Sequence, residues 1–168
     1  GTISATAFRG DGSELTNINS GITDTLNNVK IGSSALVSNT TGSNNVAIGL
    51  SALSINTEGE ENIAIGRSAM MFNSTGKRNI ALGPASLENN SSDDNIGIGY
   101  KSLFLSTSGE KNIALGNYAL SSNTTGSGNT TIGVSSLISN TTGNYNLAIG
   151  NNTLNSNLTG NDNIAKIG

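Results

Sequence analysis

The chain has 168 residues and a formal charge of −3, and it contains no cysteine and no histidine. The usual ligands of zinc, haem and iron–sulfur clusters are therefore missing, as are the base–nucleophile pairs of serine and cysteine hydrolases. For this reason we expect no cofactor. Because the chain is mildly acidic and its lysines are scattered, we also expect no nucleic-acid partner. No apolar run is long enough for membrane insertion.

Residues 1–27 follow no repeat and are predicted to form a separate lead-in segment. Residues 2–8 have the composition of a strand, and residues 9–13 that of a tight turn. Arg9-Gly10-Asp11 spells the integrin-binding tripeptide, but nothing else in the sequence indicates an animal-cell partner. We favour a turn that happens to follow an arginine.

Residues 28–168 repeat one unit of seventeen residues, N-x-A-I-G-x-x-A-L-x-x-N-T-T-G-x-x, and a single interval is one residue shorter. The repeated glycines are Gly32, Gly49, Gly66, Gly83, Gly99, Gly116, Gly133 and Gly150. The asparagines four residues before them are Asn28, Asn45, Asn62, Asn79, Asn95, Asn112, Asn129 and Asn146, and Asn163 continues the column. A leucine or methionine follows each glycine by four residues. Such self-similarity is typical of a repeat architecture.

The unit favours β-structure over helix, since its glycines and its Asn-Thr-Thr-Gly cluster break helices. Seventeen residues accommodate two short strands and two turns, which make one coil of a β-solenoid. We therefore predict an all-β fold, a parallel β-roll of about eight coils that rises about 4.8 Å per coil to a length of roughly 40 Å.

The strand residues of the unit are predicted to have two apolar faces. In Asn45-Val46-Ala47-Ile48-Gly49, alternate side chains face opposite sides. We expect Val46 and Ile48 to fill the roll with the leucine column and Ala47 to face outward. A strand face exposed to water should carry polar residues, so we expect other copies of the chain to cover the alanine column.

The other repeated positions are predicted to be structural. Stacked asparagine amides can hydrogen-bond along the rod, and the glycines suit positive φ angles or close approach of the backbone. Asn-Thr-Thr-Gly is predicted to be a turn. Turn chemistry also accounts, without glycans, for the Asn-x-Ser/Thr sequences at Asn39, Asn73, Asn123, Asn140 and Asn157. The run Asn90-Ser91-Ser92-Asp93 lacks the turn glycine, which explains the single shorter interval.

Two further patterns could indicate a function. Asp93-Asp94 could attract calcium or act as a glycosidase pair, but no calcium-loop pattern or partner base accompanies it, so we expect a solvated turn and no enzyme activity. The threonine pairs of the turns could form an ice-binding array, a minor alternative because Glu58, Ser91-Ser92 and Leu158 interrupt the columns.

The run Asn45–Gly49, followed by Ala52, is similar to the head repeats of YadA-like trimeric autotransporter adhesins. The longer unit, with its Asn-Thr-Thr-Gly turn, resembles repeats of bacteriophage tail fibres, as does the lead-in over residues 3–17. The resemblance to the adhesins implies a left-handed roll packed as a tight homotrimer. Both imply a homotrimeric extracellular rod. We therefore predict a structural segment of a fibre on a virion or a cell surface, with attachment as the task of the whole fibre. The alternative is an adhesin head that binds its ligand directly along the side of the roll.

Specific binding would require residues outside the repeated columns, which are used for folding. Large side chains at variable positions include Phe72, Tyr100, Phe104 and Tyr118. Aromatic faces supply much contact area at a low cost in entropy, so these four are candidate contacts to a cell-surface glycan or protein receptor. For Phe72 and Phe104 we favour the alternative that they fill gaps at the trimer interface.

Overall fold

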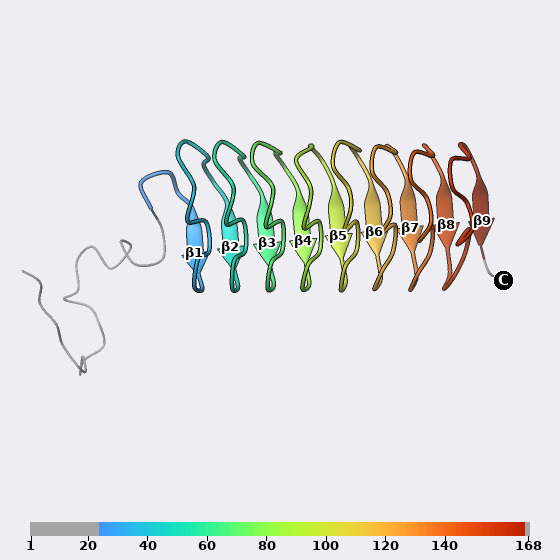
Figure 1. Ribbon diagram of the computed structural model, residues 1–168, viewed down its shortest axis with the longest axis horizontal. Helices are drawn as coiled ribbons and strands as arrows, with labels where there is room; N and C mark the ends of the chain where they lie inside the picture. The colour runs from blue at the N-terminus through green and yellow to red at the C-terminus, as the bar shows by residue number, and fades with distance from the viewer. Residues whose placement is uncertain (1–23, 167–168) are drawn as a thin grey trace, which may run out of the picture.

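The computed structural model describes residues 24–166, so Arg9-Gly10-Asp11 and most of the predicted lead-in segment fall outside it. In this part of the chain nine three-residue strands form one parallel sheet, in chain order (Figure 1). They are β1 (Val29–Ile31), β2 (Val46–Ile48), β3 (Ile63–Ile65), β4 (Ile80–Leu82), β5 (Ile96–Ile98), β6 (Ile113–Leu115), β7 (Thr130–Ile132), β8 (Leu147–Ile149) and β9 (Ile164–Lys166). The predicted parallel β-solenoid is confirmed, and its coils follow one another at the spacing of the sequence repeat.

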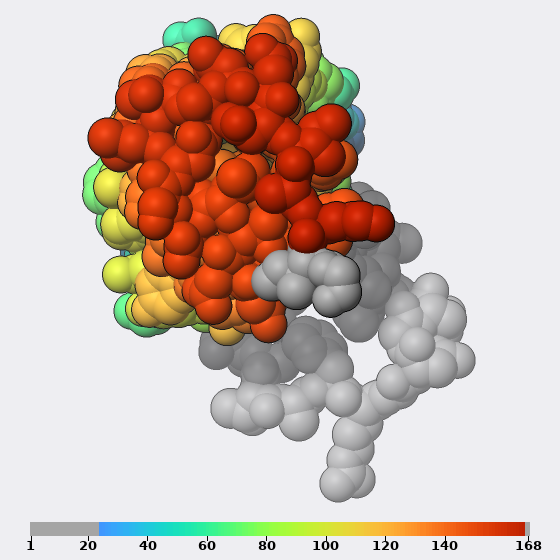
Figure 2. Space-filling view, turned by 90° about the vertical axis from the view of Figure 1, so that its right-hand side faces the viewer, coloured from blue at the N-terminus to red at the C-terminus, as the bar shows by residue number. Residues whose placement is uncertain are grey.

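Strand pairing stacks equivalent residues of the repeat on one another. Val46 of β2 pairs with Ile63 of β3, which occupies the same position in the next unit. Between β4 and β5 the spacing is one residue shorter, and Ile80 pairs with Ile96. Viewed along the rod, the last coils cover those behind them (Figure 2). Because the register is kept, any property of one position in the unit becomes a line along the rod.

Each coil contains one strand rather than the two that we expected. The second and fourth residues after the glycine are left-handed, as shown by Ser51 with φ 57° and Leu53 with φ 50°. A β-strand cannot pass through two such residues. Their backbone amides nevertheless bond to adjacent coils, from Ser51 N to Ser33 O at 2.9 Å and from Leu53 N to Ala69 O at 3.1 Å. The backbone is therefore satisfied without a second sheet.

The middle residues of β2 to β8 are buried in the interior, so our assignment of the two strand faces was wrong. Ala64 is fully buried, whereas Ile63 and Ile65 beside it are 36% and 40% exposed. The interior has room only for a small residue opposite the leucine column. At Gly97, which replaces an alanine, an added Cβ would lie 2.6 and 3.0 Å from Oγ of Ser86 and of Ser102 and 3.2 Å from Cγ of Leu87. Close packing therefore puts the alanines inside and the branched residues outside.

The asparagine column forms a ladder of amides along the rod. Oδ1 of Asn28 accepts hydrogen bonds from the backbone N and from Nδ2 of Asn45, at 2.8 and 3.1 Å. Nδ2 of Asn45 also donates to the carbonyl oxygen of Gly59 at 2.8 Å. Asn62 repeats the arrangement on Asn45. Since these side chains are fully buried, losing one amide would leave its neighbours unsatisfied.

Asp24 caps the first rung of this ladder. Its Oδ1 accepts hydrogen bonds from the backbone N and from Nδ2 of Asn28, both at 3.1 Å, as an asparagine of a preceding coil would. Burial raises the pKa of Asp24, but the hydrogen bonds from Asn28 and Leu26 outweigh it and hold the pKa below its usual value. The cap therefore stabilises the folded chain at pH values above the usual pKa of an aspartate, and this contribution is lost as the pH falls through the lowered pKa of Asp24.

A second ladder runs through the asparagines of the turns. Nδ2 of Asn56 donates to Oδ1 of Asn39 at 2.9 Å and to the carbonyl oxygen of Gly59 at 3.1 Å. The same carbonyl oxygen accepts a hydrogen bond from Asn45 of the first ladder. Asn73, Asn123 and Asn140 are fully buried in this second ladder. The structural role of these side chains in the turns therefore accounts for the recurrent Asn-x-Ser/Thr sequences. In the shorter coil, Ser92 takes the place of the turn glycine. Its carbonyl oxygen accepts from Nδ2 of Asn79 and of Asn90, both at 2.8 Å.

The second ladder is interrupted at Ser106, which occupies an asparagine position and whose buried Oγ has no partner among the described residues. We expect Ser106→Asn to give Nδ2 of Asn123 a second acceptor and to add about 1 kcal/mol of stability. The thermal midpoint should rise by about 2–4 °C in a melt followed by circular dichroism. Asn140→Ser, which copies the break into an intact rung, should lower it. A fall with Ser106→Asn would show that the gap relieves crowding instead.

The repeated glycines are required both by conformation and by space. Gly49 has a φ of 133°, and a Cβ built on it would lie 2.5 Å from the carbonyl oxygen of Gly66 in the next coil. The same holds for Gly32, with φ 126° and 2.6 Å to the carbonyl oxygen of Gly49. An L side chain would therefore force neighbouring coils apart immediately after each strand.

Candidate functional site

The outer face of the sheet carries an apolar stripe, which we define as the first and third residues of β1 to β9 and call the isoleucine stripe. All of these residues are Val, Ile or Leu except Thr130 and Lys166. Ile65, Ile98 and Ile149 are 40%, 38% and 41% exposed. The stripe continues across every strand of the sheet. Monomeric soluble proteins rarely expose so long an apolar patch, which makes it a candidate interaction surface.

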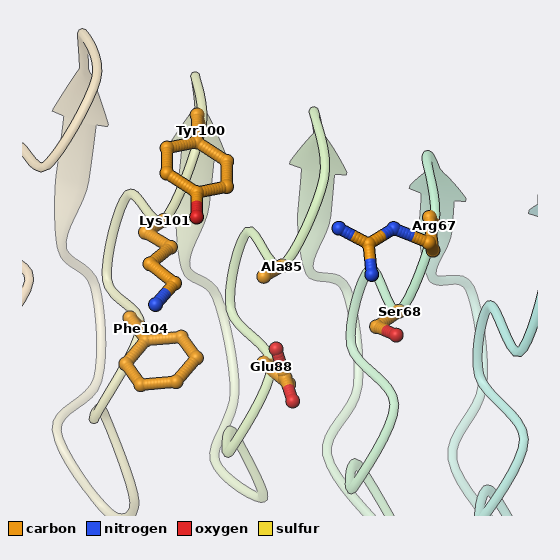
Figure 3. A pocket seen from close by; sticks show the side chains of 7 residues that line it. All are labelled: Arg67, Ser68, Ala85, Glu88, Tyr100, Lys101 and Phe104. Atoms are coloured by element: carbon orange, nitrogen blue, oxygen red, sulfur yellow. The ribbon is translucent and has the colours of Figure 1, made fainter.

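A second surface feature is an open pocket of about 280 Å³ beside the ends of three adjacent strands (Figure 3). The coil after β3 contributes Arg67 and Ser68, and the coil after β4 contributes Ala85 and Glu88. Tyr100, Lys101 and Phe104 come from the coil after β5. The pocket thus gathers long side chains from positions that are variable in the repeat.

The pocket has the shape of a trough, because the middle coil has short side chains at positions where the coils before and after it have long ones. Arg67 and Tyr100 directly follow the repeated glycine in their coils, and the residue at that position after β4 is Pro84. Ala85 is buried at the base of the trough, between the side chains of Arg67 and Lys101 (Figure 3). Two coil spacings of about 4.8 Å separate its walls, giving a width of roughly 10 Å between backbones.

Aromatic contacts hold one wall of the trough in place. The rings of Tyr100 and Tyr118 meet edge to face, with centroids 5.2 Å apart and planes at 88°. The ammonium group of Lys101 lies 4.7 Å from the ring centroid of Phe104 and 5.7 Å from that of Tyr100. Such cation–π contacts orient a lysine that would otherwise be mobile in solvent.

The charged groups of the trough are not neutralised by one another. The ion pairs within residues 24–166 join Lys77 to Glu60 at 3.3 Å, and Arg78 to Asp93 and Asp94 at 3.1 and 2.7 Å. Arg67, Lys101 and Glu88 take part in none of these pairs. Two cations and one carboxylate therefore remain available to a ligand at the rim of the pocket.

Asp93 and Asp94, the acidic pair singled out in the sequence, are engaged with Arg78. Nε of Arg78 donates to Asp94 and its Nη2 donates to both carboxylates, while the backbone N of Lys77 donates to Asp93 at 2.9 Å. The hydrogen bond from Arg78 holds the pKa of Asp94 below its usual value, and the same pairing raises the pKa of Arg78. These contacts link the turns of two adjacent coils.

The first hydroxyl of each threonine pair is also used within the rod. Oγ1 of Thr40 donates to the carbonyl oxygen of Thr57 at 2.8 Å, and Oγ1 of Thr124 to that of Thr141 at 3.0 Å. The second threonines, such as Thr125 and Thr142, are exposed. A threonine array toward solvent would therefore contain at most one threonine per coil, in a single column along the rod.

The structure brings together three of the four aromatic candidates. Tyr100, Phe104 and Tyr118 form one cluster, whereas Phe72 is 44% exposed and does not line the pocket. Sequence reasoning missed Arg67, Glu88 and Lys101 as parts of a site. Glu88 shares its column with Phe104 and Lys101 shares its column with Tyr118, one coil away, and Arg67 shares its column with Tyr100, two coils away. Reading each variable column along the rod could therefore have found them.

No family model, curated protein or solved structure matches this chain. No helix within residues 24–166 has the length and apolar character needed to span a bilayer.

Proposed function

We propose that this chain is a structural segment of an extracellular trimeric fibre that takes part in attachment, on a virion or a cell surface. The observation that carries the proposal is the isoleucine stripe. Three rolls, each left-handed as the resemblance to adhesin heads implies, pack against one another along their stripes. The rod then supports or displays other parts of the fibre.

Other copies of the chain fit the stripe better than an unrelated partner does. The stripe repeats at the coil spacing of about 4.8 Å over roughly 40 Å. A partner that covers it throughout must present apolar groups at the same spacing over the same length. A second roll does so without any further requirement, since its own stripe has the same period and composition. The number three comes from the resemblance to trimeric fibres.

A structural role also agrees with how the repeated residues are used. The asparagine ladders, the alanine and leucine columns and the glycines all contact adjacent coils. They form no converging set of catalytic groups. Repeated coils that each contact only their neighbours build a rod whose length is set by the number of units.

Single cysteines test whether the stripe is covered, because the chain has none of its own. We expect Ile98→Cys to react with a maleimide at least tenfold more slowly than Thr125→Cys, whose side chain is exposed outside the stripe. Labelling would be followed by intact-protein mass spectrometry, and both cysteines should react fully in denaturant. Equal rates under native conditions would mean that the stripe is open to solvent, contrary to the proposal.

A direct role in ligand binding, as in an adhesin head, is the second candidate function. The pocket between Arg67 and Tyr100 favours it, because this is where long variable side chains from three coils converge.

A further inference from the structure

We propose that the pocket lined by Arg67, Glu88, Tyr100, Lys101 and Phe104 binds a single sugar ring that carries a carboxylate, such as a uronic acid residue of a glycan. This inference goes beyond the structural role proposed above, since a rod that only spaces other domains needs no such site.

The shape of the trough suits one ring. Its volume of about 280 Å³ lies just below the range of about 300–1,000 Å³ that is usual for small-molecule pockets. Its base is formed by the buried Ala85, and long side chains stand on the coils to either side (Figure 3). A longer oligosaccharide would extend beyond it across the rod, parallel to the walls, with the recognised residue seated between them.

The charges select a ligand that is both anionic and rich in hydroxyl groups. Arg67 and Lys101 lack carboxylate partners among the described residues and can hydrogen-bond a ligand carboxylate, which charge assistance strengthens. Glu88, half-buried on the middle coil, accepts hydrogen bonds only and would repel a second anion. A sugar acid supplies both partners, with a carboxylate for the cations and hydroxyl groups for Glu88.

The aromatic residues provide the apolar surface and fix the lysine. Pyranose rings present apolar C–H faces that can lie on an aromatic ring, and Tyr100 and Phe104 offer such surfaces in the same wall. The ammonium group of Lys101 lies over both rings, 5.7 Å from one centroid and 4.7 Å from the other. Tyr118 acts as a positioning residue through its edge-to-face contact with Tyr100. The site is therefore largely organised before the ligand binds, which reduces the entropic cost of binding.

Titrations with glucuronate, glucose and the peptide Gly-Asp-Gly test the inference on the intact 168-residue chain. Followed by ligand-observed NMR, glucuronate should bind saturably with a dissociation constant on the order of 1 mM, as expected for so small a ligand. Glucose should bind at least tenfold more weakly because it lacks the carboxylate. Equal binding of glucose, tighter binding of the peptide, or no saturable binding of glucuronate would overturn the assignment.

Variants locate the binding site. Arg67→Gln and Lys101→Gln should each weaken glucuronate binding about tenfold, the usual effect of losing one charge-assisted hydrogen bond. Lys111→Gln is the matched control, because Lys111 is exposed outside the pocket and shares the left-handed backbone of Lys101, with φ 56° against 53°. It should bind as the unaltered chain does, and equal losses with Lys111→Gln and Lys101→Gln would overturn the proposal. Native mass measured on the same samples separates the two proposals: a monomer that binds glucuronate contradicts only the assembly, and a trimer that does not bind contradicts only the site.

Discussion

Ala81→Glu is expected to unfold the middle of the roll. Ala81 is fully buried, pairs with Ala64 and Gly97 in the adjacent strands, and belongs to the continuous core cluster. A glutamate there would have to be buried without a partner, and the space opposite the leucine column is already filled. The free energy of unfolding should fall by roughly 4 kcal/mol or more, the range of an uncompensated buried charge.

The measurement is a denaturant titration followed by circular dichroism, with Arg67→Glu as the control. Arg67 is exposed, so the same new side chain there should change the free energy of unfolding by about 0.5 kcal/mol or less. If Ala81→Glu left the transition unchanged, the alanine column would face outward and the orientation of the strands described above would be wrong.

Ile65→Glu combined with Ile98→Glu is expected to separate the copies and to leave each roll folded. Both side chains lie on the outer face, at 40% and 38% exposure, so two carboxylates there can be hydrated in a single roll. In a packed trimer the same change would bury six charges at an apolar interface, where each unpaired charge is costly. The double variant should therefore give a circular dichroism spectrum close to that of the unaltered chain, but the mass of one chain.

Thr75→Glu combined with Thr142→Glu provides a matched control for this variant. Both threonines are exposed and lie in the turns, away from the stripe, and the change in net charge is the same. Assembly should persist in this control. If both double variants dissociated alike, the cause would be general charge repulsion, and the stripe would lose its assigned role.

Much of the fold could be predicted from the spacing of residues. Columns such as Asn28, Asn45 and Asn62 follow directly from a constant period, and a parallel solenoid is the structure that stacks them. The direction of the two strand faces could not be predicted, because Val46, Ala47 and Ile48 are all apolar. The decision rests on the width of the interior, which is filled by the leucine column together with the small residues beside it.

The number of strands per coil was wrong for a related reason. Leu53 has a side chain that β-strands accept, and nothing in its identity indicates a φ of 50°. Its conformation is imposed by the need to turn the chain around a core one leucine wide. At the surface, the aromatic candidates were recognisable one by one. The pocket is formed only when residues from three coils are stacked. Arg67 and Glu88 could therefore be recognised as site residues only because they line the same pocket as Tyr100 and Lys101.

The mass of the native chain at micromolar concentration tests the central claim most directly. Native mass spectrometry, with the glutamate variant of Ile65 and Ile98 as the dissociated reference, would compare it with the 17.0 kDa of one chain. Assembly along the isoleucine stripe predicts a single species at three times that mass for the unaltered chain. A folded species at the mass of one chain, at every concentration tried, would contradict it.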